Sequence, residues 1–230
     1  MVFKRSLFLI AMCCLFTILR VSAQSSNAQK NRQITLSHEL ATLYDISDLP
    51  LYRSNSLSAQ ISSYDTTGGN EDGFNGDYSF VRRNPDSTLV LFDVKGSGVI
   101  NRIWTPTPTE DTLDFYIDDT TNPAISVKYR DLFSGKVFPF TAPLCGSQLG
   151  GNFCYFPILF QERCVIIARA KKTRFHQIQY RLFEKNTRVQ PFSFMLSREE
   201  QQSLKKIELL WNKENKEADD FIPVNTKFKT

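Results

Sequence analysis

The residues best suited to chemistry lie in one loop, residues 62–74, with the sequence Ser-Ser-Tyr-Asp-Thr-Thr-Gly-Gly-Asn-Glu-Asp-Gly-Phe. Asp65, Asn70 and Asp72 can together accept and donate several hydrogen bonds within one small volume. The glycine pair at positions 68 and 69 allows positive φ and a close approach of the backbone to a ligand. Such a loop could bind a polyol, a sugar ring or a hard cation. Alternatively, it is a turn whose Asp and Asn side chains cap their own backbone.

Few other residues compete for a functional role. Trp104 could stack on a sugar face or close a hydrophobic core, and Arg102 could pair with a loop acid, a sugar hydroxyl or an ordinary surface acid. His176 alternates with apolar residues and is interpreted as a packed structural histidine. His176 and His38 are far apart in sequence, and no cysteine spacing matches a zinc site. The sequence therefore predicts no metal site and no cofactor.

The N-terminus has the features of an export signal. The positively charged residues Lys4 and Arg5 precede a mostly apolar run, Leu7 to Leu19. The small residues Val21-Ser22-Ala23 then form a cleavage site. We expect residues 1–23 to be removed and the protein to be periplasmic or extracellular, with no membrane contact after cleavage. Arg20 lies close to the cleavage site, which leaves an uncleaved anchor as the alternative. Removal of three basic residues and no acid lowers the formal charge from +4 to +1, so no nucleic-acid partner is predicted.

Short apolar runs separated by turn signals predict a mainly β protein. Residues 24–35 are interpreted as a disordered lead and Ser37–Tyr44 as a short helix capped by Ser37. Residues 36–196 are predicted to be an antiparallel jelly-roll sandwich. Its expected strands are Tyr78–Arg82, Thr88–Val94, Gly98–Trp104, Leu113–Ile117, Ala124–Val127, Phe153–Leu159, Cys164–Ala168, Phe175–Phe183 and Phe192–Leu196. Its expected core includes Phe92, Val94, Ile103, Phe115, Ile117 and Ile158.

Residues 197–230 have a different pattern. Ser197-Arg198-Glu199-Glu200 forms a capping box, and apolar residues then recur at helical spacing. An amphipathic helix is therefore predicted to begin at Ser197. Phe221-Ile222-Pro223-Val224 is typical of the start of a further extended segment.

Three cysteines follow the signal, Cys145, Cys154 and Cys164. Cys154 and Cys164 lie within strand-like apolar runs, which favours buried, reduced thiols. A hairpin disulfide between Cys154 and Cys164 is the alternative. An odd number of cysteines in an exported protein leaves at least one thiol unpaired or joined to another molecule.

Several short motifs occur in series over roughly residues 36–185. The opening motifs are Ser63-Tyr64-Asp65, Thr67-Gly68-Gly69-Asn70 and Asp72-Gly73-Phe74. Later motifs are Tyr78-Ser79-Phe80, Leu91-Phe92-Asp93, Gly96-Ser97-Gly98-Val99-Ile100, Arg102-Ile103-Trp104-Thr105-Pro106-Thr107-Pro108, Asp114-Phe115-Tyr116-Ile117-Asp118, Leu132-Phe133-Ser134-Gly135, Pro143-Leu144, Gly150-Gly151, Cys154-Tyr155-Phe156-Pro157-Ile158 and Phe175-His176-Gln177-Ile178-Gln179-Tyr180.

Together these motifs resemble glycoside hydrolase family 172, also known as the domain-of-unknown-function 2961 family. The resemblance implies a jelly-roll fold, assembly into homo-oligomers and activity on furanosides, either α-D-fructofuranosides or α-D-arabinofuranosides. It also implies a retaining mechanism with two glutamates, which requires carboxyl groups about 5–5.5 Å apart. Asp65, Asn70 and Asp72 match the family's signature loop, so a role in substrate binding is expected for them. Trp104 is included with them as the aromatic residue that could stack on a sugar face.

The family's catalytic glutamates are expected downstream of residue 230, and the glutamates at positions 184, 199, 200, 208 and 214 are poor substitutes. No catalytic residue is therefore predicted, and residues 197–230 are interpreted as a helix and the start of the second half of the family domain. The favoured function is the N-terminal part of an exported furanosidase-like protein that is inactive alone. The alternatives are a noncatalytic carbohydrate-binding or assembly module and an unstable relic without a function.

Overall fold

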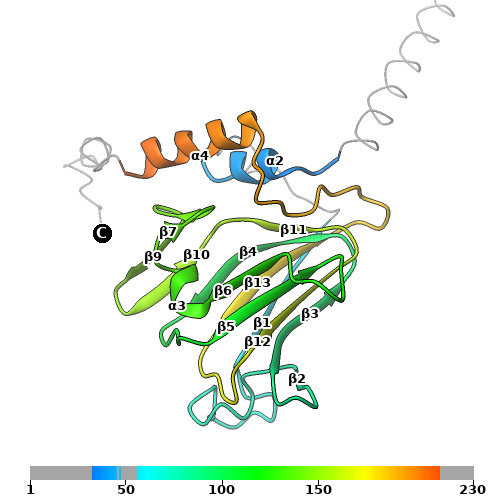
Figure 1. The fold of residues 1–230 in the computed structure, drawn as a ribbon, viewed down its shortest axis with the longest axis vertical. Helices are drawn as coiled ribbons and strands as arrows, with labels where there is room; N and C mark the ends of the chain where they lie inside the picture. The colour runs from blue at the N-terminus through cyan, green and yellow to red at the C-terminus, as the bar shows by residue number, and fades with distance from the viewer. Residues whose placement is uncertain (1–32, 46, 48–55, 213–230) are drawn as a thin grey trace, which may run out of the picture.

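Two antiparallel β-sheets form the body of the protein (Figure 1). The computed structural model describes residues 33–45, 47 and 56–212. The expected export signal and the extended segment after residue 220 lie outside these residues. One sheet has the order β1 (Ser56–Ser62), β13 (Gln177–Phe183), β4 (Gly98–Thr105), β10 (Gly151–Cys154) and β9 (Cys145–Gln148), and β11 (Ile158–Phe160) also pairs with β4. The other has the order β2 (Arg82–Arg83), β3 (Leu89–Lys95), β12 (Arg163–Ala168), β5 (Thr112–Ile117) and β6 (Ile125–Lys128).

The strand order is that of a jelly roll. The eight principal strands in chain order are β1, β3, β4, β5, β6, β10, β12 and β13. The first, eighth, third and sixth of them are neighbours in one sheet, and the second, seventh, fourth and fifth are neighbours in the other. These are β1, β13, β4 and β10, and then β3, β12, β5 and β6. Their pairings are antiparallel throughout. The prediction of an antiparallel jelly-roll sandwich is confirmed.

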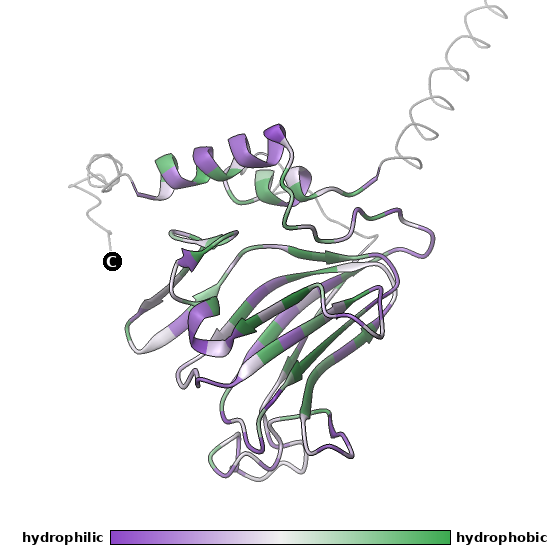
Figure 2. Ribbon diagram, viewed as in Figure 1, coloured by the Kyte–Doolittle hydropathy of each residue, from purple (hydrophilic) through white to green (hydrophobic). Residues whose placement is uncertain are grey.

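The core lies between the inner faces of the two sheets. All six residues predicted to be buried are buried, and Phe92, Phe115 and Ile158 have no exposed surface. The Phe92 ring meets the Phe160 and Tyr180 rings edge to face, at centroid distances of 6.5 and 5.2 Å. Figure 2 shows hydrophobic and hydrophilic residues alternating along the strands, as expected for sheets with one buried face.

Three parts of the strand prediction are wrong. Residues 78–81 form no strand: the Ser79 amide donates to the Gly76 carbonyl at 3.4 Å in a turn, the Val81 amide donates to the Val90 carbonyl at 2.7 Å, and only the short β2 follows. The run Phe153–Leu159 is two strands, β10 and β11, interrupted before Pro157, which has no N–H for a ladder. Residues 192–196 are irregular, since the Phe192 ring packs in a cluster with other aromatic rings, those of Phe140, Phe156 and Phe194.

Short helices and a small ribbon complete the fold. They are α2 (Leu36–Ala41), α3 (Tyr129–Leu132) and α4 (Arg198–Trp211), with the ribbon of β7 (Lys136–Val137) and β8 (Phe140–Thr141). The cap of α2 is Thr35 rather than the predicted Ser37, since the Thr35 hydroxyl accepts the His38 amide at 3.3 Å. The capping box of α4 is confirmed: the Ser197 hydroxyl accepts the Glu200 amide at 3.3 Å and the Ser197 amide donates to Glu200 at 2.7 Å.

Helices α2 and α4 lie side by side over one end of the sandwich (Figure 1, top). Ile34, at the end of the expected disordered lead, is tied to the sandwich, because its amide donates to the Arg188 carbonyl and its carbonyl accepts the Gln190 amide, both at 2.8 Å. The helices of the described residues include none with the length and apolar character needed to cross a membrane. The proposed boundaries at residues 24, 36 and 197 stay predictions.

Candidate functional site

The loop that follows β1 lies at the end of the sandwich opposite α2 and α4 (Figure 1, bottom). It is held there by the segment between β12 and β13. The Ser63 amide donates to the His176 carbonyl at 3.1 Å, and the His176 amide donates to the Ser63 hydroxyl at 3.2 Å. The Thr173 hydroxyl donates to the Ser79 carbonyl at 3.0 Å, and the Phe74 and Phe175 rings meet edge to face. The loop is therefore anchored at several points.

Asp65 organises the inside of this loop. Its side chain is only 5% exposed. One carboxylate oxygen accepts the Thr67 hydroxyl at 2.6 Å and the Thr67 amide at 2.9 Å, and the other accepts the Glu71 amide at 3.4 Å. The Thr67 hydroxyl is the main reason that the pKa of Asp65 lies below its usual value. Asp65 is an ionised acceptor of loop hydrogen bonds.

Asp72 also bonds within the loop. Its carboxylate accepts the Asp65 amide at 2.7 Å, and its backbone has a φ of 37°. At the next residue, Gly73, φ is 95°, and a Cβ would lie 2.9 Å from the Ser63 hydroxyl. Only glycine fits there. The two aspartates thus behave as the capping interpretation expects.

Asn70 differs from the two aspartates. It is exposed, and its side chain makes no hydrogen bond within the part of the chain that the structure describes. Asn70 is therefore the predicted loop residue whose donor and acceptor face solvent. A sugar contact by any of the three loop residues stays a prediction.

Trp104 lies on the outer face of the sheet, in a row that begins where the loop begins. The strand register places Ser62, Gln177, Trp104 and Phe153 side by side on β1, β13, β4 and β10. Trp104 and Phe153 are half-buried, whereas Ile103 and Thr105, which flank Trp104 in the strand, are buried inside the sandwich. Trp104 therefore does not close the core. We call these four residues, together with Arg102, the outer row.

The outer row is held by contacts among its own residues. The Arg102 guanidinium donates to the Gln177 amide oxygen at 2.9 Å and lies 5.7 Å from the centre of the Trp104 ring. Gly151 lies against the Trp104 indole so closely that a Cβ there would collide with the ring nitrogen. Within the described residues the Trp104 N–H has no hydrogen-bond partner. The row therefore offers an aromatic surface with nearby cationic and amide groups.

Sequence reasoning missed Gln177 and Phe153 as members of this site. Gln177 follows Trp104 by more than seventy residues in the chain. The two are neighbours because β13 pairs with β4, and this pairing also allows the bond between Gln177 and Arg102. One signal could have found them, because successive side chains of a strand point to opposite faces of the sheet. Gln177 precedes buried Ile178 and Phe153 precedes buried Cys154, so both are expected on the outer face. Alternation gives the face of each residue but not the pairing of the strands.

His176 lies buried beneath the loop, as the structural interpretation predicts. It is 2% exposed, and its Nδ1 lies 3.3 Å from the Arg174 carbonyl oxygen, while its Nε2 has no partner among the described residues. Burial lowers the pKa of His176 to about 4. The histidine is therefore neutral in the folded protein at neutral pH.

We predict that acid weakens the fold through His176. The unfolded chain binds a proton at its ordinary pKa of about 6.5, so stability is lost as the pH falls from about 6.5 toward 4. The free energy of unfolding should decrease by about 2 kcal/mol between pH 7 and pH 5, measured by urea unfolding. His176→Gln serves as the control and should show a much smaller decrease. An equal decrease in both proteins would contradict this role of His176.

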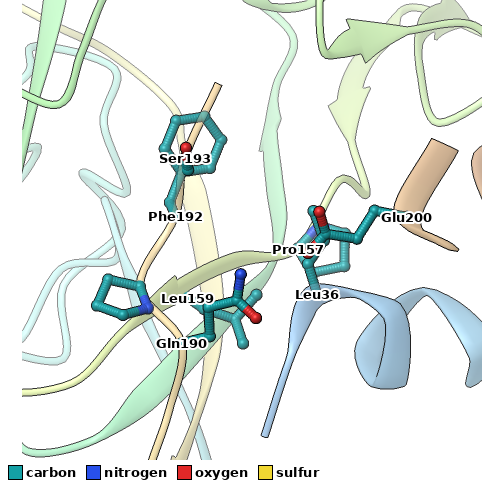
Figure 3. Close-up of a pocket in the computed structure, with 8 residues that line it drawn as sticks. Leu36, Pro157, Leu159, Gln190, Phe192, Ser193 and Glu200 are labelled. Atoms are coloured by element: carbon teal, nitrogen blue, oxygen red, sulfur yellow. The ribbon is translucent and has the colours of Figure 1, made fainter. Parts of the chain in front are cut away.

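A hollow at the other end of the sandwich contains few groups suited to binding or catalysis. Figure 3 shows Leu36, Leu159, Phe192 and Glu200 around it, together with Pro157, Gln190 and Ser193. The Glu200 carboxylate is used by the capping box of α4. Among the described residues, no three His, Cys, Asp or Glu side chains gather where they could hold a metal ion.

The fold and the outer row define an antiparallel jelly-roll sandwich with polar and aromatic residues on one outer face. The sequence model of the GH172 first beta-sandwich domain matches residues 54–200. The chain therefore belongs to glycoside hydrolase family 172, as its motifs indicated. A search of curated proteins found no match to the chain.

Proposed function

We propose that this chain forms part of a furanoside-binding site in an exported family-172 protein. The observation that carries the proposal is the contact of Arg102 with both Trp104 and Gln177, directly beside the signature loop. Membership of a glycoside hydrolase family supports carbohydrate as the ligand.

The outer row has the chemistry that a furanose ring requires. An indole can cover the apolar C–H surface of a sugar, and its N–H can donate to a hydroxyl. Arg102 supplies charged donors, and Gln177 supplies an amide. Because Arg102 is already held between Gln177 and Trp104, little side-chain entropy is lost when a sugar binds.

The signature loop has two roles in this proposal. Asn70 contacts the sugar, since its side chain is exposed. Asp65 and Asp72 hold the loop in shape, since their carboxylates accept loop amides. Their effect on binding is then mainly through the position of the loop rather than through direct contact.

We further propose that the described residues do not hydrolyse furanosides without additional groups. Retaining hydrolysis needs a nucleophile and an acid/base on carboxyl groups about 5–5.5 Å apart. Asp65 and Asp72 bond to loop amides, and Glu200 caps α4 at the opposite end of the sandwich. The four residues aligned across the outer row, from Ser62 to Phe153, include no acid.

The alternative function is a noncatalytic carbohydrate-binding or assembly module. Such a module would bind sugar through the same outer row. It differs from the first proposal because its complete site would contain no catalytic pair of carboxyl groups. Steady release of nitrophenol from nitrophenyl furanosides by the purified protein would contradict the proposed inactivity. Sugar binding without turnover, even after addition of the other parts of a family-172 enzyme, would favour the noncatalytic module.

Trp104→Ala should weaken furanoside binding roughly 30-fold, which corresponds to about 2 kcal/mol, as is usual for removal of a central aromatic contact. Calorimetric titration with fructofuranosides and arabinofuranosides measures the effect. The matched control is Trp211→Phe, because it keeps an aromatic ring against Tyr155, which packs on Phe153 of the outer row, and removes only the indole N–H that bonds to the Leu43 carbonyl. Equal affinity in the Trp104→Ala and unmodified proteins would contradict a contact at Trp104.

Assembly into a homo-oligomer is also proposed. Its support is the exposed apolar surface at the end of α4, where Leu209, Leu210 and Trp211 are 60%, 45% and 40% exposed. Export to the periplasm or the exterior is proposed from the signal features of residues 1–23.

A further inference from the structure

Strands β9 and β10 place two cysteines directly opposite each other. Cys145 pairs with Cys154 in the antiparallel register. The next pair, Leu144 and Tyr155, is joined by a backbone hydrogen bond of 2.8 Å, so the cysteines form a non-hydrogen-bonded pair. Cα atoms of such pairs are about 4.5 Å apart, within the range of about 4.4–6.8 Å that a disulfide spans.

The surroundings of the two thiols distinguish them from the third. Cys145 and Cys154 are each 1% exposed, and because they are directly opposite each other their side chains lie on the same face of the hairpin. Cys164 lies in the other sheet, on β12, where it pairs with Val94 and Ile117. All three thiols are free and buried, as the favoured interpretation predicted, and the alternative hairpin disulfide between Cys154 and Cys164 is wrong, because Cys154 pairs with Cys145 in one sheet and Cys164 lies in the other.

We propose that Cys145 and Cys154 form a cross-strand disulfide when the protein folds in the presence of a small disulfide such as oxidised glutathione. One cysteine thiolate attacks the glutathione disulfide, which forms a mixed disulfide and releases one glutathione thiolate. The second cysteine thiolate then attacks the protein sulfur of the mixed disulfide, which closes the cross-strand bond and releases the second glutathione. The cysteine pair loses two electrons, the glutathione disulfide gains them, and the two thiol protons pass through solvent to the released glutathione thiolates.

The reaction belongs to the folding process rather than to the closed sandwich. The neighbouring Cys154 thiol and burial raise the pKa of the Cys145 thiol, so a thiolate scarcely forms after the hairpin is packed. In the unfolded chain the same thiols are exposed and ionise normally. Once formed, the disulfide ties together the hairpin whose β10 strand holds Gly151 and Phe153 against Trp104.

Peptide mapping tests the proposal without reference to sugar binding. The protein is refolded with oxidised and reduced glutathione, alkylated in denaturant without reduction and digested with trypsin. The peptide from residue 137 to residue 163 contains Cys145 and Cys154 and no other cysteine, and Cys164 begins the next peptide. We expect the first peptide to be unalkylated and lighter by two hydrogens, and Cys164 to be alkylated.

Two results would overturn the proposal: alkylation of both Cys145 and Cys154, or a linkage of either one to Cys164. The Cys154→Ser variant is the matched control and should give full alkylation of Cys145. Thermal unfolding supplies a second readout, since the oxidised protein should have a higher melting temperature than the reduced protein. Equal melting temperatures of the two forms would contradict a bond that fits the native hairpin.

Discussion

Phe115→Ala should lower the free energy of unfolding by about 3–5 kcal/mol. Phe115 is fully buried on β5, where it lies opposite Ile166 of β12 and Ile125 of β6. Removal of its ring takes away apolar contacts and leaves a cavity that two rigid sheets cannot readily fill. Urea unfolding followed by circular dichroism measures the change.

Phe138→Ala is the matched control for Phe115→Ala. Phe138 is 53% exposed, so its replacement should change the free energy of unfolding by no more than about 0.5 kcal/mol. A loss within that same range for Phe115→Ala would show that Phe115 does not pack between the sheets.

Arg181→Met should also destabilise the fold, by about 3–5 kcal/mol. The Arg181 guanidinium donates to both oxygens of Glu39 at 2.7 Å and so joins β13 to α2. The Glu39 side chain is only 1% exposed, and removal of Arg181 would leave its buried carboxylate with the His38 imidazole, 3.5 Å away, in place of a permanent cation. Chemical unfolding at pH 7 provides the measurement.

A double variant, Glu39→Gln with Arg181→Met, separates the ion pair from simple loss of packing. It should recover part of the lost stability, because no unpaired charge is then buried. If the double variant is less stable than Arg181→Met alone, the unpaired carboxylate is not the cause of the loss.

Much of the sandwich was predictable because its central strands alternate clearly. Val94, Ile103 and Phe115 lie on inner faces, as their patterns indicated. The edge strand β1 was missed because Ser56–Ser62 contains three Ser, one Ala and one Gln among its seven residues, which gives a weak strand signal. Strand β9 and the first half of β10 were missed because their glycines and Ser147 resemble a turn.

The site was only partly predictable. The density of polar groups at Asp65, Asn70 and Asp72 identified the loop, but local composition could not show that both carboxylates bond to loop amides. Trp104 was identified, whereas its neighbour Gln177 was not. Their contact depends on the pairing of β4 with β13, which joins distant parts of the chain and which no local pattern specifies.

Fluorescence of Trp104 tests the central claim, that a furanoside binds on the outer row, most directly. The chain contains two tryptophans, so the variant Trp211→Phe leaves Trp104 as the only indole. Titration of this variant with a fructofuranoside or an arabinofuranoside should change the emission of Trp104 saturably, with the same dissociation constant that calorimetry gives. Emission that stays unchanged through a titration in which calorimetry records binding would contradict the claim, as would the absence of binding by both methods.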